Sequence, residues 1–301
     1  MIDFSPHAVA YLDILGFKNF IIVAEKNFDK LEKLNNLFNE VIPREILPDG
    51  KNSTYSKDFE MKCLSISDSL IVSAPVSENQ THPALVVVTM KAIQIAHALL
   101  DMGFLVRGAI NIGNVYRTDT NILGTGYQDA VMFGDKSGDP PQIILTDNAT
   151  VALNKSVKNG MPTYSIFALN ELGQTILNAI HPEPSYLPDP QGNITEYFKK
   201  YRAVIKENLS SDDKKVKSKW LWFAKLFNAN VQYFSTLDSS MAIELDSHGI
   251  TINYLNTPEE NSNWMDRFMA PGRTVIINSN HNKTEQSVET RQGQYQHKGK
   301  Q

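Results

Sequence analysis

The chain has 301 residues, of which 42% are hydrophobic, and its formal net charge is -4. A chain of this length and composition can bury one sizeable core together with an accessory region. The negative charge gives no general attraction to nucleic acid, so we do not expect a nucleic-acid partner. Cys63 is the only cysteine, which excludes an intramolecular disulfide and a zinc site built from several cysteines.

The N-terminus carries no basic stretch followed by an apolar segment. No apolar run reaches the roughly 18 to 20 residues of a membrane span without polar interruption. These two features predict a cytoplasmic protein with no stable membrane anchor.

The first predicted element is a buried strand over Ala8–Leu12. It is followed by Asp13, a glycine turn at Gly16 and the start of a helix, so the aspartate is expected at a strand edge, facing outward. Apolar residues at helical spacing then predict one or two helices between residues 18 and 42, with a break near Asn27.

The next pattern is a hairpin. Two apolar stretches, Met61–Ile66 and Leu70–Ala74, flank the segment Ser-Asp-Ser centred on Asp68, which is typical of a tight turn between strands. If these strands neighbour the first one, Asp13 and Asp68 converge. Two carboxylates over a backbone turn form a hard oxygen site suited to magnesium or manganese carrying phosphates.

Helices and strands continue to alternate downstream. In chain order the sequence predicts a helix from Pro83 to about Met102, a strand carrying Arg107, a turn over Arg117–Asn121, a helix over about Gly126–Phe133 and a strand over Gln142–Leu145. The order strand, helix, strand, strand, helix, strand is that of a ferredoxin-like α+β fold.

The character of the chain changes beyond about residue 190. A turn-rich linker leads into two predicted helices, Ile194–Leu209 and Val216–Tyr233, and Met241–Tyr254 contains a possible hairpin. The aromatic cluster Trp220–Phe223 could be a stacking surface for nucleic acid, but its helical spacing favours core packing. We predict a domain over residues 1–190, an accessory region over 191–278 and a disordered tail over 279–301.

Three motifs, in this order, resemble those of class III nucleotide cyclases. Tyr11-Leu12-Asp13-Ile14-Leu15-Gly16-Phe17 is similar to their Phe-x-Asp-Ile-x-Gly-Phe signature, Ser67-Asp68-Ser69 to their Gly-Asp hairpin, and Leu105–Gly113 to their Arg-x-Gly-Ile-x-x-Gly strand. The resemblance covers roughly residues 8–146 and is most like the bacterial pyrimidine cyclases of the Pycsar antiphage system. It implies a ferredoxin-like class III catalytic core with a C-terminal helical accessory layer.

The resemblance also implies a two-metal site for Mn²⁺ or Mg²⁺. Asp13 and Asp68 would be the carboxylate ligands and the Ile14 carbonyl a third ligand, and two such ions can activate the 3′-hydroxyl, polarise the α-phosphate and neutralise the leaving pyrophosphate. Taken singly, Asp13 could instead be a helix N-cap and Asp68 an ordinary turn residue.

The triphosphate is expected at the start of the first helix and on the third motif. Backbone amides at a helix N-terminus bind phosphate oxygens, and Arg107 is the family's triphosphate-binding arginine, unless it pairs with a surface acid. Asp13, Asp68 and Arg107 are thus the expected catalytic residues. The residues expected to hold the triphosphate at the turn are Leu15, Gly16, Phe17 and Lys18, although for the side chain of Lys18 a solvated position is favoured over a phosphate contact.

The departures from the family concern the base and the transition state. Purine cyclases have a lysine and an acid that read the base where this chain has Leu64 and Asn121, and an asparagine and an arginine where it has Gln128 and Met132. These differences favour a pyrimidine cyclase that converts UTP, or else CTP, to the 3′,5′-cyclic monophosphate. The alternatives are a catalytically silent nucleotide-binding module and a purine cyclase. The resemblance further implies a homodimer whose base pocket lies across the interface.

Overall fold

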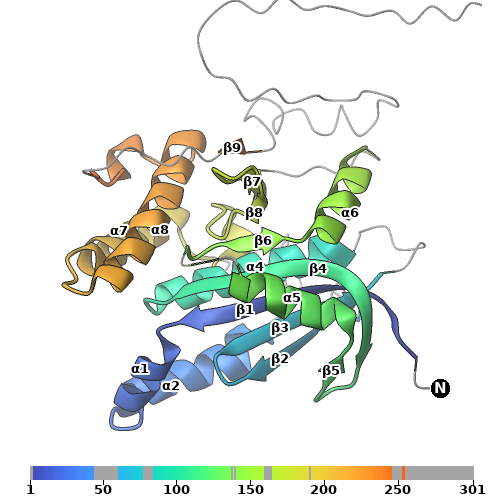
Figure 1. Ribbon diagram of the computed structural model, residues 1–301. Coiled ribbons are helices and arrows are strands. Elements are labelled where there is room, and N and C mark those ends of the chain that lie inside the picture. The colour runs from blue at the N-terminus through green and yellow to red at the C-terminus, as the bar shows by residue number, and fades with distance from the viewer. Residues whose placement is uncertain are drawn as a thin grey trace, which may run out of the picture.

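The computed structural model describes residues 3–43, 60–76, 84–136, 138, 140–158, 165–189, 191–245 and 253–254. Its centre is a single mixed sheet with the strand order β2-β3-β1-β4-β6-β8-β7-β9, and β5 pairs with β4 (Figure 1). β4 and β6 run parallel, whereas the other neighbouring strands are antiparallel. The strands are β1 Ser5–Leu15, β2 Lys62–Ile66, β3 Ser69–Pro75, β4 Leu105–Arg117, β5 Ile122–Leu123, β6 Ile143–Leu145, β7 Phe167–Leu169, β8 Thr175–Leu177 and β9 Asn253–Tyr254.

Helices cover both faces of the sheet. Several begin at side chains that accept hydrogen bonds from the first turn, as Asn27, Asn193 and Asp213 do, because Asn and Asp are good N-caps. The helices are α1 Phe17–Ala24, α2 Phe28–Asn36, the π-helical turn Leu37–Val41, α4 Ala84–Asp101, α5 Thr125–Lys136, α6 Asp147–Lys158, α7 Ile194–Leu209, α8 Lys214–Tyr233 and the short 3-10 turns Pro184–Tyr186 and Ser239–Met241.

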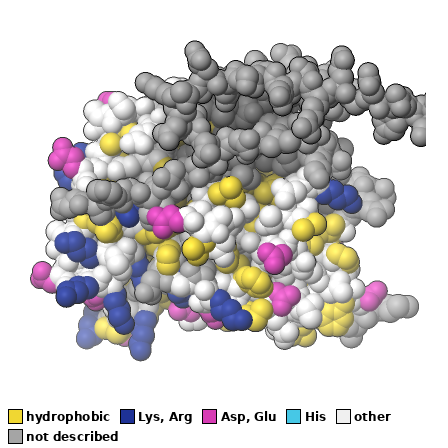
Figure 2. Space-filling model, turned by 45° about the horizontal axis from the view of Figure 1, so that its top comes forward, with side chains coloured by type: hydrophobic (Ala, Val, Ile, Leu, Met, Phe, Trp, Pro, Cys, Tyr) yellow, Lys and Arg dark blue, Asp and Glu magenta, His cyan; other side chains and the backbone are white. Residues whose placement is uncertain are grey.

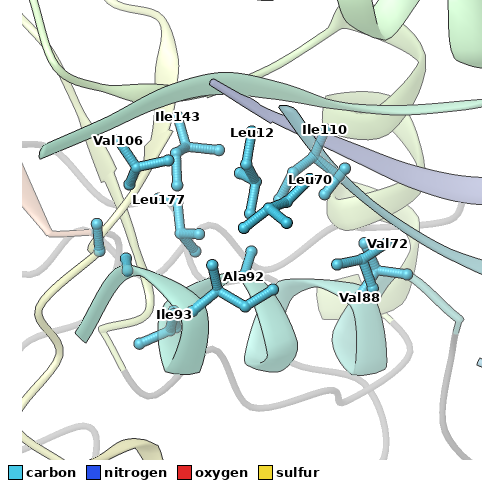
Figure 3. Close-up of a cluster of buried hydrophobic side chains, with 14 of the residues drawn as sticks. Leu12, Leu70, Val72, Val88, Ala92, Ile93, Val106, Ile110, Ile143 and Leu177 are labelled. Atoms are coloured by element: carbon cyan, nitrogen blue, oxygen red, sulfur yellow. The ribbon is translucent and has the colours of Figure 1, made fainter. Parts of the chain in front are cut away.

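The largest core lies between the sheet and α4. Side chains alternate along a strand, so one set of β1 residues faces α4 and the other faces α5. Figure 3 shows the α4 side of this arrangement, where sheet residues pack over the helix. The labelled sheet residues are Leu12, Leu70, Val72, Val106, Ile110, Ile143 and Leu177, and those of α4 are Val88, Ala92 and Ile93.

The α4 helix is long and apolar enough to cross a membrane, and among the described helices it alone has this property. Of its apolar window, 83% is buried inside the protein. This burial is typical of the central helix of a packed domain, and the contacts of α4 with β1, β3 and β4 explain its hydrophobicity.

A second layer is formed by α7 and α8. Their buried aromatic residues pack with Leu100 of α4 and Leu105 of β4, so the layer continues the core. Trp220, Phe223 and Phe227 are all buried there, which confirms that this aromatic cluster is core packing.

On the face drawn in Figure 2, Lys and Arg gather toward the lower left, while hydrophobic side chains are dispersed over the remainder.

The predicted α+β, ferredoxin-like core with a helical C-terminal layer is confirmed by this architecture. The first strand is longer than predicted, because β1 pairs with β4 as far as Leu15, and Asp13 therefore lies within the strand. The sequence pattern missed α6 and the short strands β7 and β8, which extend the sheet beyond β6. The boundary at residue 190 stays a prediction, and both the tail and the centre of the possible hairpin near residue 248 lie outside the described residues.

Candidate active site

The centre of the candidate site is the end of β1, which lies between β3 and β4. In the strand register Asp13 is opposite Ser69 on β3 and opposite Arg107 on β4. The β2–β3 turn contains Asp68, and its carbonyl accepts a hydrogen bond of 2.9 Å from the amide of Ile14. Three segments that are far apart in the sequence thus place the two aspartates and the arginine at one end of the sheet.

Asp13 and Arg107 form a direct ion pair. Nη2 of Arg107 lies 2.8 Å from Oδ2 of Asp13, and their side chains are only 22% and 16% exposed. Nη1 of Arg107 donates a long hydrogen bond of 3.3 Å to the carbonyl of Gly138. The buried Nε of Arg107 has no hydrogen-bond partner among the residues that the structure describes.

The electrostatic surroundings of Asp13 are mixed. Burial raises the pKa of the Asp13 carboxyl, the hydrogen bond and charge of Arg107 lower it, and the charges of Asp68 and Asp135 raise it again. Asp68 therefore lies close enough to Asp13 for their charges to interact. Repulsion between the carboxylates favours a cation at this position, and in this structure the guanidinium of Arg107 supplies that positive charge to Asp13.

Asp135 is a further acid of the site, and sequence reasoning missed it. It lies on α5, and its charge also raises the pKa of Tyr11, although burial is the main cause of that shift. The neighbouring Gly134 brings α5 against the sheet, since a Cβ there would lie 2.9 Å from the ring of Tyr11. The helix predicted from the sequence ended at about Phe133, two residues before Asp135, so no sequence pattern indicated this acid.

The start of α1 has the form expected of a phosphate-binding turn. Gly16 has φ 82° and ψ 4°, a left-handed conformation that glycine adopts readily, and no side chain caps the helix. The first amides of α1 are therefore not used by a side-chain cap, and they follow the strand that carries Asp13. Phe17 is buried against Phe38 and Phe104 and anchors the turn. Lys18 is exposed and Leu15 is half-buried.

The donor set suits a hard divalent cation. Asp13 and Asp68 offer carboxylate oxygens and Ile14 a carbonyl oxygen, the donor type that Mg²⁺ and Mn²⁺ prefer. Within the described ranges no group of three or more His, Cys, Asp or Glu residues could hold a metal ion. Asp13, Asp68 and the Ile14 carbonyl would be a small ligand set, as is usual for ions that share their coordination with substrate phosphates.

The positions expected to read the base hold an apolar and an amide side chain. Leu64 is half-buried and packs against the cluster around Tyr11, while Asn121 is exposed at the tip of the β4–β5 connection. Two residues before each of them, Lys62 and Asp119 form an ion pair of 2.5 Å. This pair was not identified from the sequence, because only the register of β2 and the fold of the hairpin bring it together.

Gln128 and Met132 on α5 are the positions at which the family resemblance predicts an asparagine and an arginine. Gln128 is exposed, and Met132 has 41% of its surface exposed, so neither side chain is used in the described core. The glycine-rich segment from Gly124 to Gly126 packs the start of α5 on β4, because a Cβ on Gly126 would lie 2.7 Å from the backbone of Gly113. This close packing is a structural reason for glycine at these positions.

No protein-family model and no curated protein matches the chain. Solved structures that match include an adenylate/guanylate cyclase/hydrolase from Silicibacter pomeroyi, with 15% identity, a TM-score of 0.36 and coverage of 58% of this chain and 95% of that one. A guanylyl cyclase domain of the RhoGC fusion protein from the aquatic fungus Blastocladiella emersonii has 15% identity, a TM-score of 0.35 and coverage of 57% and 94%.

A class III adenylyl cyclase-like ATP-binding protein from Pseudomonas aeruginosa also matches, with 15% identity, a TM-score of 0.32 and coverage of 50% of this chain and 35% of that one. At such identities and TM-scores the assignment of the fold rests on the strand order and helix packing described above.

Proposed function

We propose that this protein is a metal-dependent nucleotide cyclase. The observation that carries the proposal is the convergence of Asp13, the Asp68 turn and Arg107 at the end of β1, directly before the uncapped start of α1. Two acids suited to divalent cations, one arginine and free helix amides form the set of groups that a triphosphate requires.

The proposed reaction is an intramolecular phosphoryl transfer. The 3′-oxygen of the nucleotide forms a bond to the α-phosphorus, the bond from that phosphorus to the oxygen bridging to the β-phosphorus breaks, and the hydroxyl proton is released. The products are the 3′,5′-cyclic monophosphate and pyrophosphate. Bound Mn²⁺ or Mg²⁺ would supply charge for the 3′-oxygen, the α-phosphate and the leaving group.

The residues of the chain have separate roles in this proposal. Asp13, Asp68 and the Ile14 carbonyl would hold the metal ions. Arg107 would grip triphosphate oxygens, since its planar guanidinium can donate two parallel hydrogen bonds. The amides around Gly16 would bind phosphate oxygens at the start of α1.

We assign the substrate as a pyrimidine triphosphate, with UTP favoured over CTP by the resemblance to Pycsar cyclases. Leu64 and Asn121 replace the charged pair that purine cyclases use for the base. Lys62 and Asp119 are paired with each other nearby. A pocket built for the hydrogen-bond pattern of one base rejects another strongly, because buried donors or acceptors would be left unpaired.

We further propose a homodimer and a role as the source of a second messenger in bacterial antiphage defence. Apolar side chains are exposed on β2, α5 and β5, where Ile66, Met132 and Leu123 have 51%, 41% and 57% of their surface accessible. A second copy of the chain would cover such residues. The defence role rests on the resemblance to the Pycsar cyclases.

A competition assay tests the substrate proposal. Purified protein is incubated with equal concentrations of ATP, GTP, CTP and UTP and with Mn²⁺, and the products are identified by mass spectrometry. We expect one dominant cyclic pyrimidine nucleotide, and Asp68→Asn is the matched control without product. Predominant cyclic AMP or cyclic GMP would reject the pyrimidine assignment. No product with Mn²⁺ or Mg²⁺ would support the catalytically silent module.

A further inference from the structure

We infer that Arg107 and a divalent cation compete for Asp13, so that the site binds metal weakly until a triphosphate engages the arginine. The inference rests on the proposed function and concerns how the same site is regulated. It would make metal and nucleotide enter as a unit, with little metal bound to the protein alone.

The ion pair of Arg107 with Asp13 occupies the carboxylate that a metal ion would use. Nη2 of Arg107 lies 2.8 Å from Oδ2 of Asp13, and both side chains are largely screened from water. A cation that uses this carboxylate would lie beside a guanidinium of the same charge sign. In a half-buried site such repulsion is poorly screened, so the two cations exclude each other.

Arg107 has few hydrogen bonds that hold its guanidinium beside Asp13. Apart from Asp13, the structure gives it a 3.3 Å bond to the carbonyl of Gly138, and its buried Nε has no partner among the described residues. A buried donor without an acceptor is unfavourable. Phosphate oxygens would satisfy Nε and the two terminal nitrogens together, and would free Asp13 for the metal.

The acids around Asp13 also favour metal binding once Arg107 has moved. When Arg107 moves to the triphosphate, Asp13 loses the partner whose charge opposes the influence of Asp68 and Asp135. Of the three charged groups that act on Asp13 in the described structure, the two acids then remain, and a negative cluster attracts a divalent cation more strongly than the paired carboxylate does. Because such coupling is reciprocal, metal binding must also strengthen triphosphate binding.

Metal binding without nucleotide is the first test. Electron paramagnetic resonance measures the free Mn²⁺ in a titration and so gives the affinity of each protein for Mn²⁺. The proteins compared are the wild type, Arg107→Met, Arg107→Gln and the double variant that combines Arg107→Met with Asp13→Asn. We expect both single variants to bind Mn²⁺ at least about tenfold more tightly than the wild type, within the usual range of coupling between sites. The double variant should lose this gain.

The control for net charge is Lys199→Met, which removes a surface cation of α7 that pairs with Glu196. It should leave Mn²⁺ binding unchanged. Circular dichroism identifies any variant that fails to fold, and the two Arg107 substitutions give independent chances of a folded protein. If folded Arg107 variants bind Mn²⁺ no more tightly than the wild type, competition is refuted, although a wild type that cyclises UTP would still support the proposed function.

The reciprocal test uses inorganic tripolyphosphate in EDTA, measured by isothermal titration calorimetry. Asp13→Asn should tighten binding several-fold because it releases Arg107, whereas Asp68→Asn removes the same charge without releasing the arginine and should have a smaller effect. Equal changes in the two variants would indicate a general charge effect and overturn the inference. Binding of Mn²⁺ by no variant at all would overturn both the inference and the proposed metal site.

Discussion

At the scale of single residues, Asp13 lies at the centre of the candidate site. It lies within β1, pairs with Arg107 across the β1–β4 ladder and interacts with the charge of Asp68. Replacement of Asp13 or Asp68 by Asn keeps the size of the side chain and removes the charge that would hold a cation. We expect each variant to lose cyclic product by orders of magnitude while it remains folded.

The measurement for this pair of variants is the initial rate of cyclic product with Mn²⁺, together with circular dichroism. Cyclisation at the parental rate by both Asp13→Asn and Asp68→Asn would show that neither residue is a metal ligand.

Arg107 allows a graded prediction. Arg107→Lys keeps a positive charge but loses the planar fork, and Arg107→Ala loses both. The apparent KM for the triphosphate should therefore be higher in the Arg107→Lys variant than in the wild type, and higher still in the Arg107→Ala variant. Steady-state kinetics at saturating Mn²⁺ measures this order. Undiminished activity in both variants would show that Arg107 does not bind the triphosphate and has a structural role.

His97 is a buried residue with a measurable effect on stability. Its Nε2 lies 3.0 Å from the carbonyl of His181 and its Nδ1 3.0 Å from the hydroxyl of Tyr201. A carbonyl can only accept, so Nε2 donates and the neutral Nδ1 accepts from Tyr201. Burial lowers the pKa of His97 from 6.5 to about 3.

The sign of the pH effect follows from this lowered pKa. Between about pH 6.5 and 3 the unfolded chain binds a proton on His97 and the folded chain does not, so stability falls as the pH falls. His97→Gln should make the free energy of unfolding less steep with pH, by up to about 1.4 kcal/mol per pH unit. Urea titrations from pH 7 to 4.5 measure the slope. Tyr201→Phe, which keeps the imidazole, should retain the slope of the wild type, and an unchanged slope in His97→Gln would contradict the prediction.

At the scale of elements, α5 depends on close backbone contact with β4. A Cβ on Gly126 would lie 2.7 Å and 2.8 Å from the carbonyl carbon and oxygen of Gly113, and backbone atoms cannot rotate away. Gly126→Ala should therefore destabilise the protein by about 1 to 3 kcal/mol, as overpacking does. Gln128→Ala, an exposed substitution on the same helix, should change the unfolding midpoint little. Equal urea midpoints for these two variants would show that α5 is not held by this contact.

The elements also show what sequence patterns can and cannot predict. The β1 strand, the hairpin at Asp68, α4 and α8 were predicted because each has a long apolar period or a clear turn. Strands β7 and β8 have three residues each, too few for a period, and they form only because the sheet offers an edge after β6. Asp135 and the pair of Lys62 with Asp119 arise from register and packing, which no local pattern contains.

At the scale of the whole molecule, two layers share one sheet. The α7–α8 layer is attached to the core through Tyr201, which is fully buried, and the stacked rings of Phe198 and Phe227 join its two helices to each other. This attachment leads from α7 through His97 to α4, the helix beneath the strands that carry Asp13 and Arg107. The accessory layer is thus continuous with the core that positions the candidate site.

We propose that the sheet, the two aspartates, Arg107 and the start of α1 together cyclise a nucleoside triphosphate. The most direct measurement is the stoichiometry of the reaction with UTP and Mn²⁺, in which cyclic UMP and pyrophosphate are quantified together over time. We expect one pyrophosphate for each cyclic nucleotide, with no UDP or UMP and no product from Asp13→Asn. Release of phosphate or pyrophosphate without cyclic nucleotide, or no turnover of any of the four triphosphates, would contradict it.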